Sequence, residues 1–201
     1  MMKVIGLTGG IATGKSSASE ILLEMGAMVI DADKVGHQMY LPETEAWQEI
    51  IDTFGKDLLL PDRTINRPKL GEIVFNDKEA LKKLNQIVHP KMYKNFEEQI
   101  VSHRKRAGDK GVVVLDAAIL IEANWLPLVN QVWIVVADSN TVIDRLCAKG
   151  FTEEHARSRI SSQLTDEERK KHADVVIENN GDIPQLRVRL LAEWKKMTGN
   201  T

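Results

Sequence analysis

Apolar and polar positions follow one another along this chain in a way that predicts short buried strands separated by helices. Five apolar runs have the length and composition of strands: residues 3–7, 27–31, 111–116, 131–136 and 173–177. Between most of them, apolar residues recur at the three- and four-residue spacing of a helix face. The stretch 183–194 marks a last helix, with Pro184 in its first turn. This order predicts an α/β fold, a parallel sheet flanked by helices.

The stretch 34–110 differs from the rest because its pattern is helical almost throughout. Residues 47–54 form one apolar face, residues 81–88 a second, and residues 93–101 a third. His89-Pro90 stands between the last two faces, where proline favours a helix break. We therefore expect several helices here, inserted into the sheet.

A second inserted segment, residues 141–171, is rich in charged residues and also has a helical pattern. Within it, Thr165 and Glu168 have the spacing of a capping box. With these two insertions set aside, residues 1–33, 111–140 and 172–201 are expected to form the core.

Composition narrows the class of protein. The chain has 201 residues, of which 43% are hydrophobic, enough for one large domain or a core with inserted subdomains. Lys+Arg 27 against Asp+Glu 29 gives a formal net charge of −2, which argues against a nucleic-acid partner. The single cysteine, Cys147, excludes an intrachain disulfide and suits a reducing compartment. No apolar run reaches membrane-spanning length, so we expect a cytoplasmic chain with no membrane partner.

The residues after the first predicted strand carry the most informative motif, "GLTGGIATGKSS" at positions 6–17. Glycine, four free positions, glycine, lysine and serine form the P-loop pattern. The backbone N–H groups of such a loop point at phosphate oxygens, the lysine adds charge for the outer phosphates, and the serine hydroxyl can ligate Mg²⁺. The predicted nucleoside triphosphate site comprises Gly9, Gly10, Ile11, Ala12, Thr13, Gly14, Lys15, Ser16 and Ser17.

Acidic residues follow two of the predicted strands, at the edge where ligands collect in open α/β sheets. Asp33 lies just past the strand 27–31, where it can accept the proton of an attacking hydroxyl or cap a helix that starts at Lys34. Asp116 ends the strand 111–116, either as a Walker B acid that holds Mg²⁺ or as an ordinary loop acid.

Two further candidates lie beyond the later strands. Arg145 can bring positive charge to a transferring phosphoryl group, or it can belong to a solvated helix face with ion pairs. Asn179, with Gly181 two positions on, can contact a nucleotide base, or form only a turn before a helix capped by Asp182. The residues alone leave both questions open.

In their order along the chain, these segments resemble the dephospho-CoA kinase family. The segments that carry the likeness are "LTGGIATGKS", "VIDAD", "LNQIVHP", "VVLDAAILIE", "RL" at Arg145 and "ADVVIENNG". The likeness runs from Val4 to about Gly181. It implies a P-loop NTPase core, a helical CoA-binding insertion at residues 34–110 and a lid at residues 141–171. It also implies the last step of coenzyme A synthesis, in which ATP phosphorylates the ribose 3′-hydroxyl of dephospho-CoA.

The resemblance implies roles for individual residues on the nucleotide side. Asp33 resembles the base for the 3′-hydroxyl, and Lys15 the contact to the ATP phosphates. Arg145 resembles a lid charge on the same phosphates. Mg²⁺, held by Ser16 and Asp116 together with ATP, is the expected cofactor.

On the acceptor side, the resemblance places Arg67, within "INRPKL", and His89. The expected small-molecule partners are therefore ATP and dephospho-CoA, and no obligate protein partner is evident.

The sequence departs from the family pattern at a few positions. Ala12 stands where glycine is usual, which the loop tolerates if the backbone angle there is ordinary. His37 and Lys149 stand where arginine is usual, and Ala118 where proline is usual. Lysine keeps the charge of arginine but loses its planar fork. We expect His37 and Lys149 to affect the affinity for acceptor and ATP rather than the reaction class.

Other functions remain as alternatives. A P-loop kinase for a nucleoside or nucleoside monophosphate would share the core and lid and differ in the insertion 34–110. A GTP-dependent switch or regulatory nucleotide-binding module would require an Asn-Lys-x-Asp segment after a core strand, which the sequence lacks.

Overall fold

The structure is a computed structural model that describes residues 2–108 and 111–199. Positions 1, 110 and 201, at which predicted domain boundaries fall, lie outside the described residues. The chain packs into two compact units. The first comprises the residues up to Ile30 and from Val101 onward, and the second comprises Asp31–Ile100.

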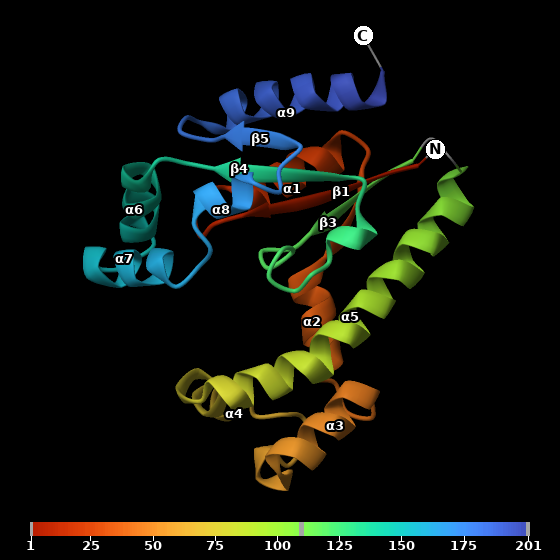
Figure 1. Cartoon of the computed structure of the whole chain (residues 1–201), viewed down its shortest axis with the longest axis vertical. Coiled ribbons are helices and arrows are strands. Elements are labelled where there is room, and N and C mark those ends of the chain that lie inside the picture. The colour runs from red at the N-terminus through yellow and green to blue at the C-terminus, as the bar shows by residue number, and fades with distance from the viewer. Residues whose placement is uncertain (1, 109–110, 200–201) are drawn as a thin grey trace. The chain divides into compact units, whose positions relative to one another are not determined.

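The first unit is built on a five-stranded sheet with the strand order β2-β3-β1-β4-β5 (Figure 1). The strands are β1 (Lys3–Gly9), β2 (Met28–Asp31), β3 (Val112–Asp116), β4 (Gln131–Val136) and β5 (Val175–Glu178). β1 pairs in parallel with β3 and with β4, and β4 pairs in parallel with β5. The predicted α/β fold with a parallel sheet is confirmed.

Helices cover the sheet, which explains why its strands are apolar on both faces. Ile5, Leu7 and Trp133 are buried in one cluster with residues of α1 (Lys15–Glu24) and α9 (Ile183–Thr198). Val113 and Ile134, which point to the opposite face, are also fully buried. Asp182 caps α9 by accepting a hydrogen bond from an N–H of its first turn, as predicted.

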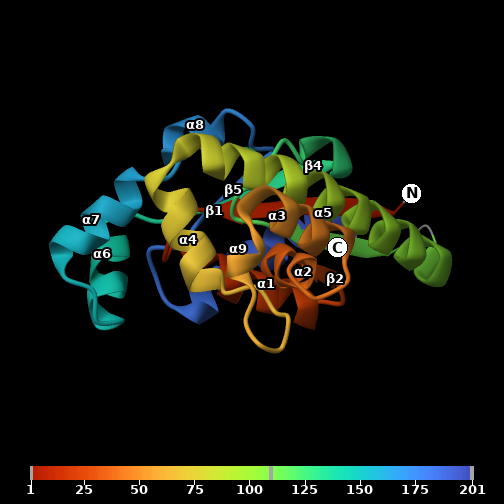
Figure 2. The same cartoon turned by 90° about the horizontal axis from the view of Figure 1, so that it is seen from below.

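The other helical segments of the first unit flank β4. η3 (Leu126–Leu128) precedes this strand, and α6 (Ser139–Ala148), α7 (Glu153–Ser161) and α8 (Asp166–Lys170) follow it. α6 and α7 pack against each other beyond the carboxyl end of β4, as Figures 1 and 2 show. The predicted capping box of Thr165 and Glu168 is present at the start of α8. Cys147 is exposed, not packed, because its neighbour Leu146 takes the buried position on α6.

The second unit is helical. It contains α2 (Ala32–Met39), α3 (Glu45–Phe54), η1 (Lys56–Leu58), α4 (Arg67–Asn76) and the larger part of α5 (Lys78–Ala107). Trp47 and Ile50 on α3 are buried, and the Trp47 indole donates a hydrogen bond to the Arg63 carbonyl oxygen at 2.9 Å. α5 ends at Ala107, three residues before position 110, where this insertion was predicted to end.

The predicted helix break at His89-Pro90 is wrong, because α5 continues through Pro90 as one helix of 30 residues. An internal proline removes one helix hydrogen bond and costs about 3 kcal/mol. Buried side chains on both sides of it, including Ile87, Val88 and Phe96, offset that cost. Despite this length, no helix within residues 2–108 and 111–199 is both long and apolar enough to cross a membrane.

Candidate nucleotide-binding site

Parallel pairing brings the ends of four strands to one edge of the sheet. Leu7 pairs with Asp116, Gly9 with Val135, and Val136 with Glu178. The loops that leave β1, β3, β4 and β5 therefore start side by side, at the edge where ligands bind in this class of fold.

The loop after β1 turns sharply into α1 at Gly14. Its φ is 101°, in the left-handed region that favours glycine, and it takes the N-cap position of α1. A β-carbon at Gly14 would lie 2.1 Å from the Asn179 amide nitrogen, and one at Gly9 would lie 2.5 Å from the Val135 carbonyl oxygen. The glycines of the motif are therefore required by close packing as well as by backbone conformation.

The backbone at Ala12 contradicts the expectation of an ordinary angle at this position. Its φ is 57°, also in the left-handed region. A residue with a β-carbon is strained there by about 1–2 kcal/mol relative to its preferred conformations. Glycine would avoid this strain, so the alanine at position 12 changes the energetics of the loop itself.

Two side chains, one from the loop after β5 and one from α6, hold the P-loop by its carbonyl groups. The Asn179 amide, which is buried, donates to the Thr13 carbonyl oxygen at 2.8 Å. The Arg145 guanidinium donates to four carbonyl oxygens: those of Ala12 and Thr13 at 3.3 Å, Asn179 at 2.9 Å and Gly181 at 3.3 Å. These bonds fix the loop against the end of β5.

The predicted phosphate-binding lysine is paired with the predicted Walker B acid. The Lys15 ammonium donates to the Asp116 Oδ1, and the two side chains are 15% and 12% exposed. An ion pair this sheltered holds the two side chains close together. It also places a movable positive charge at the mouth of the loop.

Ser16 and Asp116 offer the kind of ligands that Mg²⁺ prefers. The Asp116 Oδ2 accepts no hydrogen bond in the described part of the chain, and the same holds for the exposed Ser16 hydroxyl. A carboxylate and a hydroxyl are hard oxygen ligands, and phosphates and water complete the shell of Mg²⁺ in kinase sites. Among the described residues no group of three His, Cys, Asp or Glu side chains forms an all-protein metal site. The Ser16 hydroxyl and the Asp116 carboxylate therefore fit a hard cation such as Mg²⁺.

Two residues at the site were missed as candidates. The Ile11 N–H of the loop donates to the Gln163 Oε1 at 2.8 Å, and the Arg169 guanidinium packs against Gly10. A cavity of about 440 Å³ opens between the loop and these residues, which come from the segment that includes α7 and α8. The capping box and the charged residues of this segment predict a solvated helix. In the structure, however, Arg169 is only 2% exposed. Its burial depends on tertiary packing.

Asp33 lies in the second unit, in the first turn of α2, and is exposed. It does not cap this helix. Asp31 does, by accepting from the Lys34 N–H at 3.0 Å. Burial raises the pKa of the Asp31 carboxyl. The Lys34 N–H and ammonium together lower this pKa by more, so it lies below its ordinary value. The Asp33 carboxylate makes no hydrogen bond or ion pair in residues 2–108 and 111–199.

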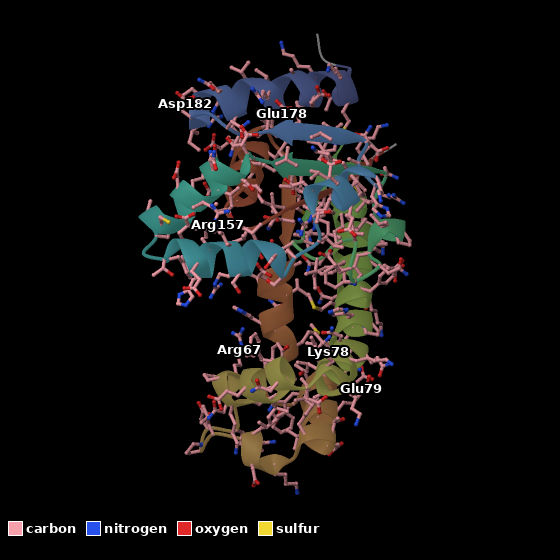
Figure 3. All side chains as sticks on the ribbon, turned by 60° about the vertical axis from the view of Figure 1, so that its left-hand side comes forward. Arg67, Lys78, Glu79, Arg157, Glu178 and Asp182 are labelled. Carbon is pink, nitrogen blue, oxygen red and sulfur yellow. The ribbon has the colours of Figure 1, made fainter. Side chains whose placement is uncertain are left out.

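The two acceptor-side candidates lie on different helices of the second unit. Arg67 projects from α4 (Figure 3), with its guanidinium carbon 5.6 Å from the centre of the Tyr40 ring. Burial raises the pKa of the Tyr40 hydroxyl, and Arg67 lowers it in part. His89 is half-buried on α5, and burial lowers the pKa of its imidazole, which favours the neutral form at pH 7.

The structure therefore brings together one part of the predicted site. The P-loop, Asp116, Arg145, Asn179 and Gly181 meet in the first unit. Asp33, Arg67 and His89 belong to the second unit, where each lies on a different helix.

A parallel sheet whose first strand leads through a P-loop into a helix defines a P-loop nucleotide-binding protein. The fold agrees with this class: shikimate kinase from Bacteroides thetaiotaomicron superposes with a TM-score of 0.54 over 98% of each chain, at 13% identity. The chain belongs to the dephospho-CoA kinase family, because the model of that family, "Dephospho-CoA kinase", matches residues 3–185.

Individual relatives are similar over nearly their whole length. The dephospho-CoA kinase of Carboxydothermus hydrogenoformans is 42% identical, with 97% of this chain and 96% of the relative covered. The solved structure of dephospho-CoA kinase from Campylobacter jejuni superposes with a TM-score of 0.73 and 28% identity, over the full length of both chains.

Proposed function

We propose that this chain transfers the γ-phosphoryl group of ATP to the ribose 3′-hydroxyl of dephospho-CoA and so completes coenzyme A. The observation that carries the proposal is the family match over residues 3–185. Full-length similarity to the dephospho-CoA kinases of Carboxydothermus hydrogenoformans and Geobacter sulfurreducens supports the same acceptor. The P-loop at the edge of a parallel sheet supports the nucleotide half of the reaction.

On the nucleotide side, the loop N–H groups around Gly14 bind the phosphates, and the Lys15 ammonium turns from Asp116 to the outer phosphates when ATP arrives. Arg145 supplies positive charge behind the loop, while its bonds to the loop carbonyls keep the N–H groups aimed at the ligand. Phosphoryl transfer depends mainly on positioning and charge, so we expect direct in-line transfer with no covalent enzyme intermediate.

Mg²⁺ neutralises charge on the β- and γ-phosphates when it is bound with ATP. The Ser16 hydroxyl and the Asp116 carboxylate are the protein groups that would hold it. This role is compatible with the Lys15 pairing, because Asp116 regains a free carboxylate as Lys15 moves to the phosphates.

On the acceptor side, Asp33 orients the 3′-hydroxyl and accepts its proton as the oxygen attacks. The exposed, unpaired state of its carboxylate supports this role, since no internal partner competes for it within the described residues. Arg67 and His89 bind the acceptor, the insertion at residues 34–110 carries it, and the segment 141–171 excludes water as a lid.

We further propose that the enzyme works in the cytoplasm, which the free thiol of Cys147 supports.

The direct test is ADP release with dephospho-CoA, compared with a panel of nucleosides and nucleoside monophosphates at equal concentration. We expect ADP release with dephospho-CoA to exceed that with every other acceptor. Faster turnover of a nucleoside would replace the proposed acceptor, and slow ATP hydrolysis independent of any acceptor would point to a regulatory module instead.

A further inference from the structure

Arg169 is the most buried charged side chain of the first unit, and its hydrogen bonds are few. Its side chain is 3% exposed, and its Nε has no hydrogen-bond partner within residues 2–108 and 111–199. In the described part of the chain its guanidinium donates a hydrogen bond only to the Leu164 carbonyl oxygen. The Arg145 guanidinium, by contrast, donates hydrogen bonds to four carbonyl oxygens.

The acidic neighbours of Arg169 do not replace the missing bonds. Glu122 Oε1 lies 3.6 Å from Nη2 and Asp166 Oδ1 lies 3.7 Å from Nη1, both beyond the normal hydrogen-bond range. Burial raises the pKa of the Asp166 carboxyl, and Arg169 lowers it only in part. A buried guanidinium with loose partners is costly to fold, and a tightly bound anion would offset that cost.

The position of Arg169 indicates where such an anion would lie. A β-carbon at Gly10 would be 3.5 Å from its Nη1, so the guanidinium lies directly against the first turn of the P-loop. Arg169 also lines the cavity of about 440 Å³ together with Gly10, Ile11 and Thr13 of the loop. The Ile11 N–H bond to Gln163 ties the chain leading into α8 to the loop, which keeps Arg169 at this position.

We propose that Arg169 is a further phosphate-contacting residue of this enzyme, whose guanidinium donates to the terminal phosphate of a nucleoside triphosphate held on the P-loop. The inference rests on the proposed function for the identity of the ligand, but not for its chemistry, because any nucleoside triphosphate presents the same terminal phosphate. It assigns a separate role to each of the two arginines beside the loop: Arg145 holds the backbone, and Arg169 contacts the ligand.

The test is the affinity of Arg169→Met for a non-hydrolysable ATP analogue, AMP-PNP, and for ADP, each with Mg²⁺, by isothermal titration calorimetry. Loss of a charge-assisted hydrogen bond to a phosphate weakens binding roughly 10- to 100-fold. We expect that loss for AMP-PNP, while the dissociation constant for ADP changes less than about threefold. Arg157→Met is the matched control, since Arg157 on α7 is exposed and pairs with Glu153 (Figure 3).

A purely structural role for Arg169 predicts a different result: equal weakening for both nucleotides, or none for either, and both outcomes overturn the proposal. Arg169→Lys provides a second variant, because lysine keeps the buried charge and so the fold, but loses the planar fork. It should lose AMP-PNP affinity by a smaller factor than Arg169→Met and leave ADP affinity unchanged. Equal affinities of Arg169→Lys and the unsubstituted chain for AMP-PNP would also contradict the proposal.

Turnover of dephospho-CoA by the unsubstituted chain, measured in parallel, separates this proposal from the proposed function. Selective loss of AMP-PNP affinity in a chain that does not phosphorylate dephospho-CoA would support the role of Arg169 and refute the acceptor. Turnover without selective loss would do the reverse.

Discussion

The two units of this chain hold their candidate site residues in different ways. Around the P-loop, hydrogen bonds and an ion pair within the first unit hold the polar groups in place. Asn179 and Arg145 donate to loop carbonyls, and Lys15 pairs with Asp116. In the second unit, and among the described residues, Asp33 is unpaired and the Arg67 guanidinium contacts only the Tyr40 ring. We infer from this difference that phosphate binding at the P-loop would be preorganised by the protein, whereas the proposed acceptor side presents groups that a ligand must complete.

The largest effect is expected from Asp33→Asn on the acceptor side. If Asp33 accepts the proton of the hydroxyl, kcat should fall roughly 10²–10⁴-fold, which corresponds to about 3–5 kcal/mol of transition-state stabilisation. Because the variant keeps the shape of the side chain and Asp33 caps nothing, ATP affinity and thermal stability should stay unchanged. Steady-state kinetics with ATP titration checks this. A collapse of ATP binding would show that Asp33 is structural.

The next effect is expected from Arg145→Met on the nucleotide side. This change removes the Arg145 donor from four carbonyl oxygens, of which only the Thr13 carbonyl keeps a second donor, the Asn179 amide, within the described residues. It should lower the free energy of unfolding by about 1–3 kcal/mol. ATP affinity should fall in parallel, since the loop loses its support. Urea denaturation and nucleotide titration measure the two effects. Arg187→Met is the control, because that arginine is exposed and, in the part of the chain that the structure describes, pairs only with Glu24 on the surface. Equal stability of the two variants would contradict a bracing role for Arg145.

A smaller effect, of opposite sign, is expected from Ala12→Gly. Glycine removes the left-handed strain at this position, which costs about 1–2 kcal/mol, but adds about 0.4–1 kcal/mol of unfolded-state entropy. The net gain in the free energy of unfolding should be about 0.5–1 kcal/mol. Denaturation midpoints measure it. A less stable Ala12→Gly variant would show that the strain is relieved in another way.

The smallest effect is the pH dependence contributed by His89. Its folded pKa is lowered by burial, so below an unfolded pKa of about 6.5 the unfolded chain binds a proton that the folded chain resists. Stability is therefore lost as the pH falls through that value. His89→Gln should lose less stability than the unsubstituted chain between pH 7 and pH 5, in urea titrations at each pH. Identical losses would exclude His89 as a source of this slope.

The elements and caps for which local pattern and chemistry agree could be predicted from the sequence. The run Gln131–Val136 was predicted with the bounds that β4 has, because a strand buried on both faces is apolar without interruption. The P-loop, the capping box and the Asp182 cap could likewise be read from residue types at fixed spacings.

Features that depend on tertiary packing could not be read in this way. Local preference favours a break at Pro90, and only the burial of its neighbours shows why α5 continues. The backbone angle of Ala12 follows from the path of the loop, not from the residue. Arg169 lies in a sequence of charged residues that is typical of a solvated helix, yet it is buried against Gly10.

The position of the new phosphate on the product tests the central claim most directly. With ATP and dephospho-CoA, ³¹P and ¹H NMR of the purified product should show a phosphate monoester coupled to the ribose 3′ proton. Formation of that product should depend on Asp33. A phosphate on any other hydroxyl, or ATP consumption without a phosphorylated acceptor, would contradict the assignment.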